Sequence, residues 1–138
     1  MKCVRDACKP RSEVLKGDLE DAIFAADFGH VVEGIAPDVY KDPTEFFRNT
    51  HPAARLKKVV GTIFERLADA KEAGAAVRLS TGFGGGKTHT LIALWHLGNN
   101  IGKTTLGTDL LPAAGRPKKV IVAGIDASKG FETKSLWG

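Results

Sequence analysis

Residues 81–90 read TGFGGGKTHT, and this run constrains the fold more than any other part of the chain. Glycine backbone carries no Cβ atom, so it can wrap closely round a phosphate group. A helix that begins there adds unpaired N–H groups and a partial positive charge. The lysine that follows can reach the β- and γ-phosphates, and the next threonine offers a hydroxyl to Mg²⁺. The run therefore predicts a nucleotide-binding loop with ATP and Mg²⁺ as its cofactors. The predicted nucleotide contacts are Gly82, Phe83, Gly84, Gly85, Gly86, Lys87, Thr88 and His89, with Thr88 also the predicted Mg²⁺ ligand.

The match to the P-loop pattern G-x-x-x-x-G-K-[ST] departs at one position. The first glycine of the pattern falls on Thr81, and Gly82 stands one place late. The rival pattern G-x-G-x-x-G fails, because the positions that need its last glycine hold Lys87 or His89. A flexible turn with a solvated lysine is the simpler alternative.

The segments on both sides of the glycines favour an α/β fold. Residues 75–81, AAVRLST, alternate in polarity and predict a strand. The segment KTHTLIALWHLG after the loop predicts a buried helix, and KVIVAGID, residues 119–126, predicts a second strand. We therefore expect the P-loop NTPase type of α/β fold, as a partial three-layer sandwich with few strands. Residues 75–138 form its predicted nucleotide-binding core.

Residues 1–74 predict a helical N-terminal segment that precedes this core. The pattern predicts a helix over 17–29 that ends at Gly29, a loop over 30–40, and a short helix that Asp42 caps before Pro43. The strongest periodicity runs over 52–73 and predicts a long amphipathic helix whose apolar stripe extends from Leu56 to Leu67. Such a stripe needs a partner surface. An alternative function is therefore a non-enzymatic scaffold that docks on a protein partner, or on its own copy, through this helix.

Hydrolysis of ATP needs an acidic residue at the end of a neighbouring strand, in addition to the phosphate loop. Asp126, at the end of KVIVAGID, is the one candidate, and an ordinary turn-starting aspartate explains it as well. We therefore expect no catalytic residue in this chain and no hydrolysis by it alone. A small NTPase that uses Asp126 is the competing hypothesis.

Composition excludes several other classes of protein. The 138 residues include 43% hydrophobic residues, yet no apolar run approaches the ~20 residues of a membrane span, so we expect a cytoplasmic protein without membrane contact. The net charge of +4 is spread among acids, so nucleic acid is expected as a partner only indirectly. Cys3 and Cys8 stand without further ligand residues and are expected to be free thiols.

Four stretches together resemble the N-terminus of a family of large bacterial AAA-type ATPases that carries a domain of unknown function. They are DAIFAADFGHVV, FFRNTHPAARLKKVV, VRLSTGFGGGKTHTLIALWHL and GIDASKGFETKSLWG. Genes of that family are often found in phage-defence clusters, beside DNA methyltransferases and helicases. The resemblance implies that the nucleotide contacts are Gly82, Gly84, Gly85, Gly86, Lys87 and Thr88. It also implies that this chain is the front end of a longer ATPase, because the acidic strand of the family comes later than Gly138.

Overall fold

The computed structural model contains six α-helices and one 3₁₀ helix in the part of the chain that it describes. The described residues are 3, 8, 10, 12–17, 25–71, 74, 76–80, 82, 84–103, 107–112 and 116–127. The helices are α2 (Ser12–Lys16), α3 (Phe28–Glu33), α4 (Asp38–Lys41), α5 (Pro43–Arg48), α6 (Ala54–Ala68), α7 (Lys87–Asn100) and the 3₁₀ helix η2 (Thr108–Leu110).

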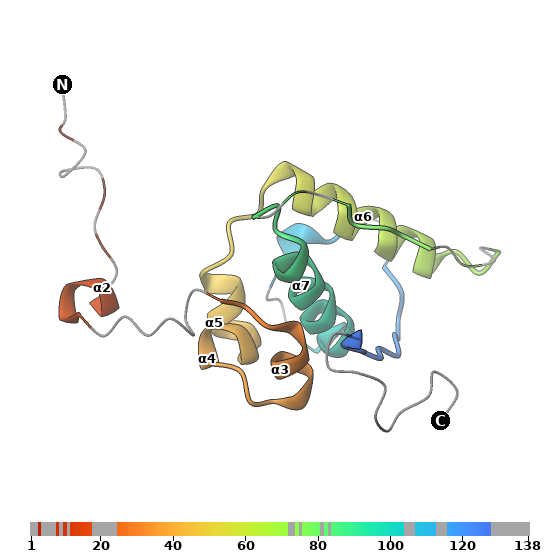
Figure 1. Cartoon of the computed structure of the whole chain (residues 1–138). Helices are drawn as coiled ribbons and strands as arrows, with labels where there is room; N and C mark the ends of the chain where they lie inside the picture. The colour runs from red at the N-terminus through yellow and green to blue at the C-terminus, as the bar shows by residue number, and fades with distance from the viewer. Residues whose placement is uncertain are drawn as a thin grey trace.

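Helix α7 lies in the middle of the molecule, with α6 crossing it on one side and α3 packed against it on the other (Figure 1). Helix η2 packs on α6, and α4 packs on α5. The buried core joins all these elements except α4 through apolar side chains. It consists of Val31, Ala36, Phe46, Leu56, Val60, Phe64, Ile92, Ala93, Leu97 and Leu110.

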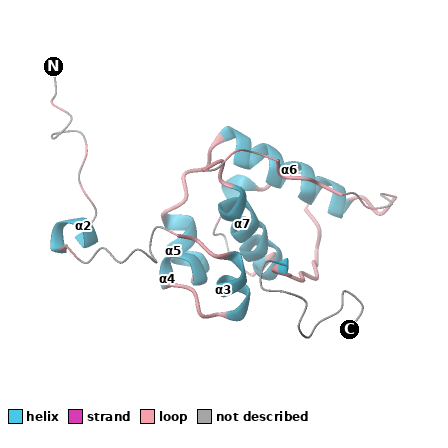
Figure 2. Cartoon of the chain, in the orientation of Figure 1, coloured by secondary structure: helices cyan, strands magenta, loops and turns pink. Residues whose placement is uncertain are grey.

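The expected α/β fold is wrong for the described residues, because none of them forms a strand (Figure 2). Residues 76–80 and 119–126, the two predicted strands, run without the hydrogen-bonded ladder that defines a sheet. Alternating apolar residues favour extended backbone, but a strand also needs a paired neighbour, and neither segment has one in the described structure. Ile121, for example, is 90% exposed. The three-layer sandwich is therefore replaced by helices packed on helices.

One side of the segment 119–126 nevertheless packs closely against the helices. A Cβ atom on Gly124 would lie 2.6 Å from Val32 Cγ2 and 3.2 Å from the Trp95 ring. A Cβ atom on Gly98 would overlap the Val122 side chain. Glycine at 98 and 124 therefore lets the segment approach α3 and α7 where any other residue would hold it away.

Helix α5 and the long helix α6 confirm the sequence predictions, with a shorter α6 than expected. Asp42 Oδ1 accepts a hydrogen bond from the Glu45 N–H at 2.9 Å, directly before Pro43. Helix α6 spans 54–68 instead of 52–73, because Asp69 turns the chain and its carboxylate accepts a hydrogen bond from the Lys71 N–H at 2.9 Å. Leu56, Val60 and Phe64 of its apolar stripe are buried within the chain itself. The packing against α7 and η2 therefore buries part of the stripe that suggested docking on a partner, while Leu67 at its end is 53% exposed.

The predicted boundaries around residue 30 are wrong. Helix α3 begins at Phe28, near the place where a helix over 17–29 was expected to end, and residues 18–24 lie outside the described residues. Asp27 caps α3, since its Oδ1 accepts a hydrogen bond from the His30 N–H at 3.1 Å. Gly34 then ends the helix at a φ of 76°. The expected loop over 30–40 therefore contains most of α3 and part of α4.

Candidate functional site

The start of α7 combines glycine turns with an uncapped helix end. Gly84 and Gly86 have φ angles of 74° and 73°, in the left-handed region that glycine reaches without strain. Gly86 is the N-cap of α7 and offers no side chain to the first turn, which also contains no acidic residue. The N–H groups of Thr88 and His89 have no acceptor among the described residues. This turn therefore presents backbone donors and the positive end of a 14-residue helix.

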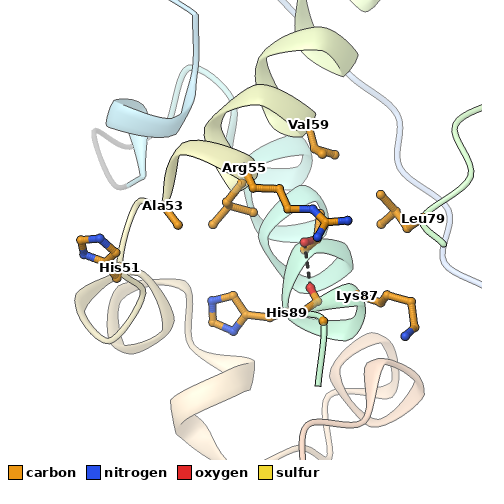
Figure 3. Close-up of a pocket in the computed structure, with 11 residues that line it drawn as sticks. His51, Ala53, Arg55, Val59, Leu79, Lys87 and His89 are labelled. Atoms are coloured by element: carbon orange, nitrogen blue, oxygen red, sulfur yellow. Dashed lines mark hydrogen bonds between the residues drawn. The ribbon is translucent and has the colours of Figure 1, made fainter. Parts of the chain in front are cut away.

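A pocket of about 230 Å³ opens at this helix start. Its walls come from two parts of the chain that are far apart in sequence. One wall is the stretch from His51 to Val59 at the start of α6, and the other is the glycine loop with Leu79 before it and the first turn of α7 after it (Figure 3). The full lining consists of His51, Ala53, Arg55, Leu56, Val59, Leu79, Gly85, Gly86, Lys87, His89 and Thr90.

The charged residues of the pocket are all basic. Arg55 and Lys87 both line it, and no aspartate or glutamate stands among its described lining residues. Helix α6 also begins here without a side-chain cap and without an acidic residue in its first turn. Two helix starts and two cations therefore concentrate positive potential in one small, partly apolar pocket. Such a site is suited to an anion, and its apolar wall of Leu56, Val59 and Leu79 is suited to a flat organic group.

Lys87 folds back on the loop that precedes it. Its Nζ donates a hydrogen bond to the Gly82 carbonyl at 3.0 Å, and the Gly85 N–H donates to the same carbonyl at 3.3 Å. Thr90 fixes the other end of the turn, because its hydroxyl donates to the Gly86 carbonyl at 2.8 Å. A Cβ atom on Gly84 or Gly86 would meet nothing within 4 Å. The described structure therefore has no close neighbour at either of these two Cβ positions.

His89 borders the pocket and is anchored to the neighbouring wall. Its Nε2 lies 3.0 Å from Thr50 Oγ1. The Thr50 hydroxyl donates to the Phe46 carbonyl at 2.7 Å, so the imidazole N–H donates to Thr50. The ring also packs on Phe46, with a centroid distance of 4.6 Å. His89 therefore ties α7 to the end of α5 and gives shape to the pocket.

The structure brings together half of the predicted contact residues at this pocket. Gly85, Gly86, Lys87 and His89 line it. Gly82, Gly84 and Thr88 lie in the same turn but not in the lining, and Phe83 lies outside the described residues. The site thus uses the later part of the glycine run and the first turn of α7.

Asp126 is not among the lining residues. A Cβ atom on Gly29 would lie 2.6 Å from Asp126 Oδ2 and 3.2 Å from Asp27 Oδ1, so the aspartate packs against the start of α3. The hypothesis of a small NTPase that uses Asp126 therefore finds no support in this placement.

Comparison with models of known protein families identifies the family of this chain. The model of the DUF499 N-terminal domain matches residues 3–115. The chain belongs to the DUF499 family. The matched region of this DUF499 chain contains the glycine loop, both walls of the pocket and the seven helices that the described residues form. No curated protein and no solved structure matches the chain.

The sequence pattern did not predict that the start of α6 lines the same pocket as the glycine loop. His51 and Arg55 lie more than twenty-five residues before the glycine loop, and both line the pocket with Lys87. The stretch THPAARL gives one local signal, because a basic residue stands at the start of a helix, where the helix dipole makes it unfavourable. A residue placed against the dipole is a reason to look for an anion nearby.

The described residues of the DUF499 chain contain neither a candidate membrane span nor a cluster of metal-ligating side chains. No described helix is both long enough and apolar enough to cross a lipid bilayer. No group of three or more histidine, cysteine, aspartate and glutamate side chains among the described residues is arranged to hold a metal ion. Cys3 and Cys8 are exposed and are free thiols, as expected.

We expect the DUF499 chain to lose stability as the pH falls below 6.5. Burial lowers the pKa of His89 and His96 from the ordinary value of 6.5, and for His96 a hydrogen bond to the Tyr40 carbonyl at 2.8 Å opposes this shift only in part. The unfolded chain therefore binds more protons than the folded chain below that pH. The free energy of unfolding should be at its plateau above 6.5 and fall as the pH drops towards the folded-state pKa values.

Urea titrations at several pH values between 7.5 and 5.5 measure this effect. Replacing both histidines by glutamine should flatten the curve over that range, because a glutamine does not titrate. An unchanged slope in His89→Gln/His96→Gln would show that other groups cause the pH dependence.

Proposed function

We propose that this chain binds a nucleoside triphosphate, ATP with Mg²⁺, at the pocket between α6 and α7. The observation that carries the proposal is the pocket itself, where the uncapped start of α7, Lys87 and Arg55 meet without an acidic residue in the described lining. An anion with several charges is the ligand that such a pocket favours. The adjoining apolar wall offers a surface to the base or the sugar.

The residues present fit the phosphate groups of a nucleotide. The N–H groups of Thr88 and His89 lack acceptors in the described structure, and a Cβ atom on Gly84 or Gly86 would meet nothing within 4 Å. Lys87 would exchange its hydrogen bond to Gly82 for phosphate oxygens, and Thr88 would offer its hydroxyl to Mg²⁺. Bound Mg²⁺ would neutralise part of the phosphate charge. We propose binding without hydrolysis by this chain alone, since no described carboxylate lines the pocket.

We also propose that the chain serves as the front end of an AAA-type ATPase linked to phage defence or DNA transactions. Membership of the DUF499 family supports this context, together with the resemblance of the four stretches that surround and include the glycine loop.

Replacing Lys87 with alanine is expected to weaken MgATP binding by about tenfold to a hundredfold, the effect of losing one charge-assisted hydrogen bond. Isothermal titration calorimetry of wild type and Lys87→Ala measures it. Lys103→Ala is the matched control, because Lys103 also bonds a backbone carbonyl, that of Asn99 at 3.1 Å, but near the other end of α7. The control should bind like wild type. Equal affinity in the two lysine variants, or no binding by wild type, would overturn the proposal.

A further inference from the structure

Arg55 is a cation that lines the pocket and is not part of the buried core. It lies in the first turn of α6, whose packing residues are Leu56, Val60 and Phe64. Its side chain extends from α6 towards the start of α7 (Figure 3). No hydrogen bond or ion pair joins Arg55 to another residue in the described part of the chain.

The neighbouring lysines of α6 differ from Arg55 in their surroundings. Lys57 and Lys58 line a separate depression that also contains Glu65 and Asp109, so acidic side chains stand near them. The pocket of Arg55 contains a second cation, Lys87, and no acidic residue among its described lining. A guanidinium that shares a small pocket with an ammonium group is repelled by it, and a bound anion removes this repulsion.

We propose that Arg55 binds the phosphate chain of the nucleotide from the α6 wall, as a second cation opposite Lys87. This inference rests on the proposed function. The planar guanidinium suits two oxygens of a phosphate group at once, whereas the lysine ammonium acts as a point charge. The two cations come from separate elements on different walls of the pocket, so a chain of linked phosphates can contact both through different groups. The site therefore favours ligands with two or more linked phosphates over monophosphates.

The test compares Arg55→Ala, Arg55→Lys and Lys57→Ala by calorimetry, with MgATP, AMP and inorganic tripolyphosphate as the probes. Arg55 and Lys57 are both exposed residues of α6, so neither change is expected to disturb folding. Arg55→Ala should weaken MgATP and tripolyphosphate by the same factor, about tenfold to a hundredfold, and AMP by much less. Arg55→Lys should recover part of the loss, because the charge remains and the two-oxygen geometry does not. Lys57→Ala should bind all three probes like wild type.

Three results would overturn the inference. The first is that Arg55→Ala binds MgATP like wild type while Lys87→Ala binds it more weakly. This result would exclude a role for Arg55 and leave the proposed function intact. The second is that Arg55→Ala loses affinity for MgATP but not for tripolyphosphate. This result would mean that Arg55 contacts the nucleoside and not the phosphates. The third is a wild-type chain that binds none of the probes, in which case the proposed function fails as well.

Discussion

Replacing Phe46 with alanine is expected to lower the free energy of unfolding by about 3–5 kcal/mol. Phe46 is 1% exposed and packs at the point where α5 meets α7. Its ring lies 5.2 Å from the ring of Phe47, 4.6 Å from His89 and 5.3 Å from His96, measured between centroids. The truncation therefore leaves a cavity in the core and removes the surface on which both histidines rest. A loss of this size is a large share of the ~5–15 kcal/mol that a folded domain has in total.

Urea denaturation followed by circular dichroism measures this loss, and Phe46→Leu is the control. Leucine fills much of the same volume, so the control should lose less than about 1.5 kcal/mol. We also expect Phe46→Ala to weaken MgATP binding in the fraction that stays folded, because His89 then loses its support beside the pocket. A loss below about 1 kcal/mol would show that Phe46 does not hold α5 on α7.

Replacing Gly107 with alanine is expected to cost about 2–4 kcal/mol, from two causes that add. Gly107 has a φ of 65°, which strains any residue with a Cβ atom. A Cβ atom there would also lie 2.7–2.9 Å from three ring atoms of Phe47. The ring also contacts Phe46 and His96, so moving it aside would disturb these contacts. The change should therefore push η2, and with it the buried Leu110, away from its place against α6.

Gly102→Ala separates the two causes. Gly102 has a φ of 73°, and a Cβ atom there would meet nothing within 4 Å. It should therefore show the backbone strain alone, about 1–2 kcal/mol. The difference between the two variants in thermal or urea unfolding measures the contact with Phe47. Equal losses of unfolding free energy in the two variants would mean that the contact with Phe47 costs nothing and that only the backbone conformation requires glycine at position 107.

Local signals in the sequence predicted several elements well. Asp42 before Pro43 predicted the start of α5, because a carboxylate cap and a fixed proline φ act within a few residues. The period of Leu56, Val60 and Phe64 predicted the buried face of α6. The glycine run predicted a loop before α7, and Gly84 and Gly86 in that loop have positive φ angles.

Signals that depend on distant residues predicted poorly. Residues 119–126 have the alternation of a strand, but a strand exists only with a paired neighbour, and the described structure provides none. The sequence pattern assigned no element to Leu110, yet it is 3% exposed because η2 packs on α6. The sequence pattern assigned no role to Arg55, and only the packing of α6 on α7 places it at the pocket.

The sequence by itself determined the glycine turn, the helices on either side of it and the basic side chains near them, because propensity, capping and glycine conformation act over a few residues. Only the tertiary structure decided that the start of α6 forms the second wall of the pocket, that Asp126 packs against α3, and that no described strand pairs with another. The reason is physical. Packing and hydrogen bonding between segments far apart in the chain determine which surfaces meet. A local sequence pattern therefore does not predict these contacts.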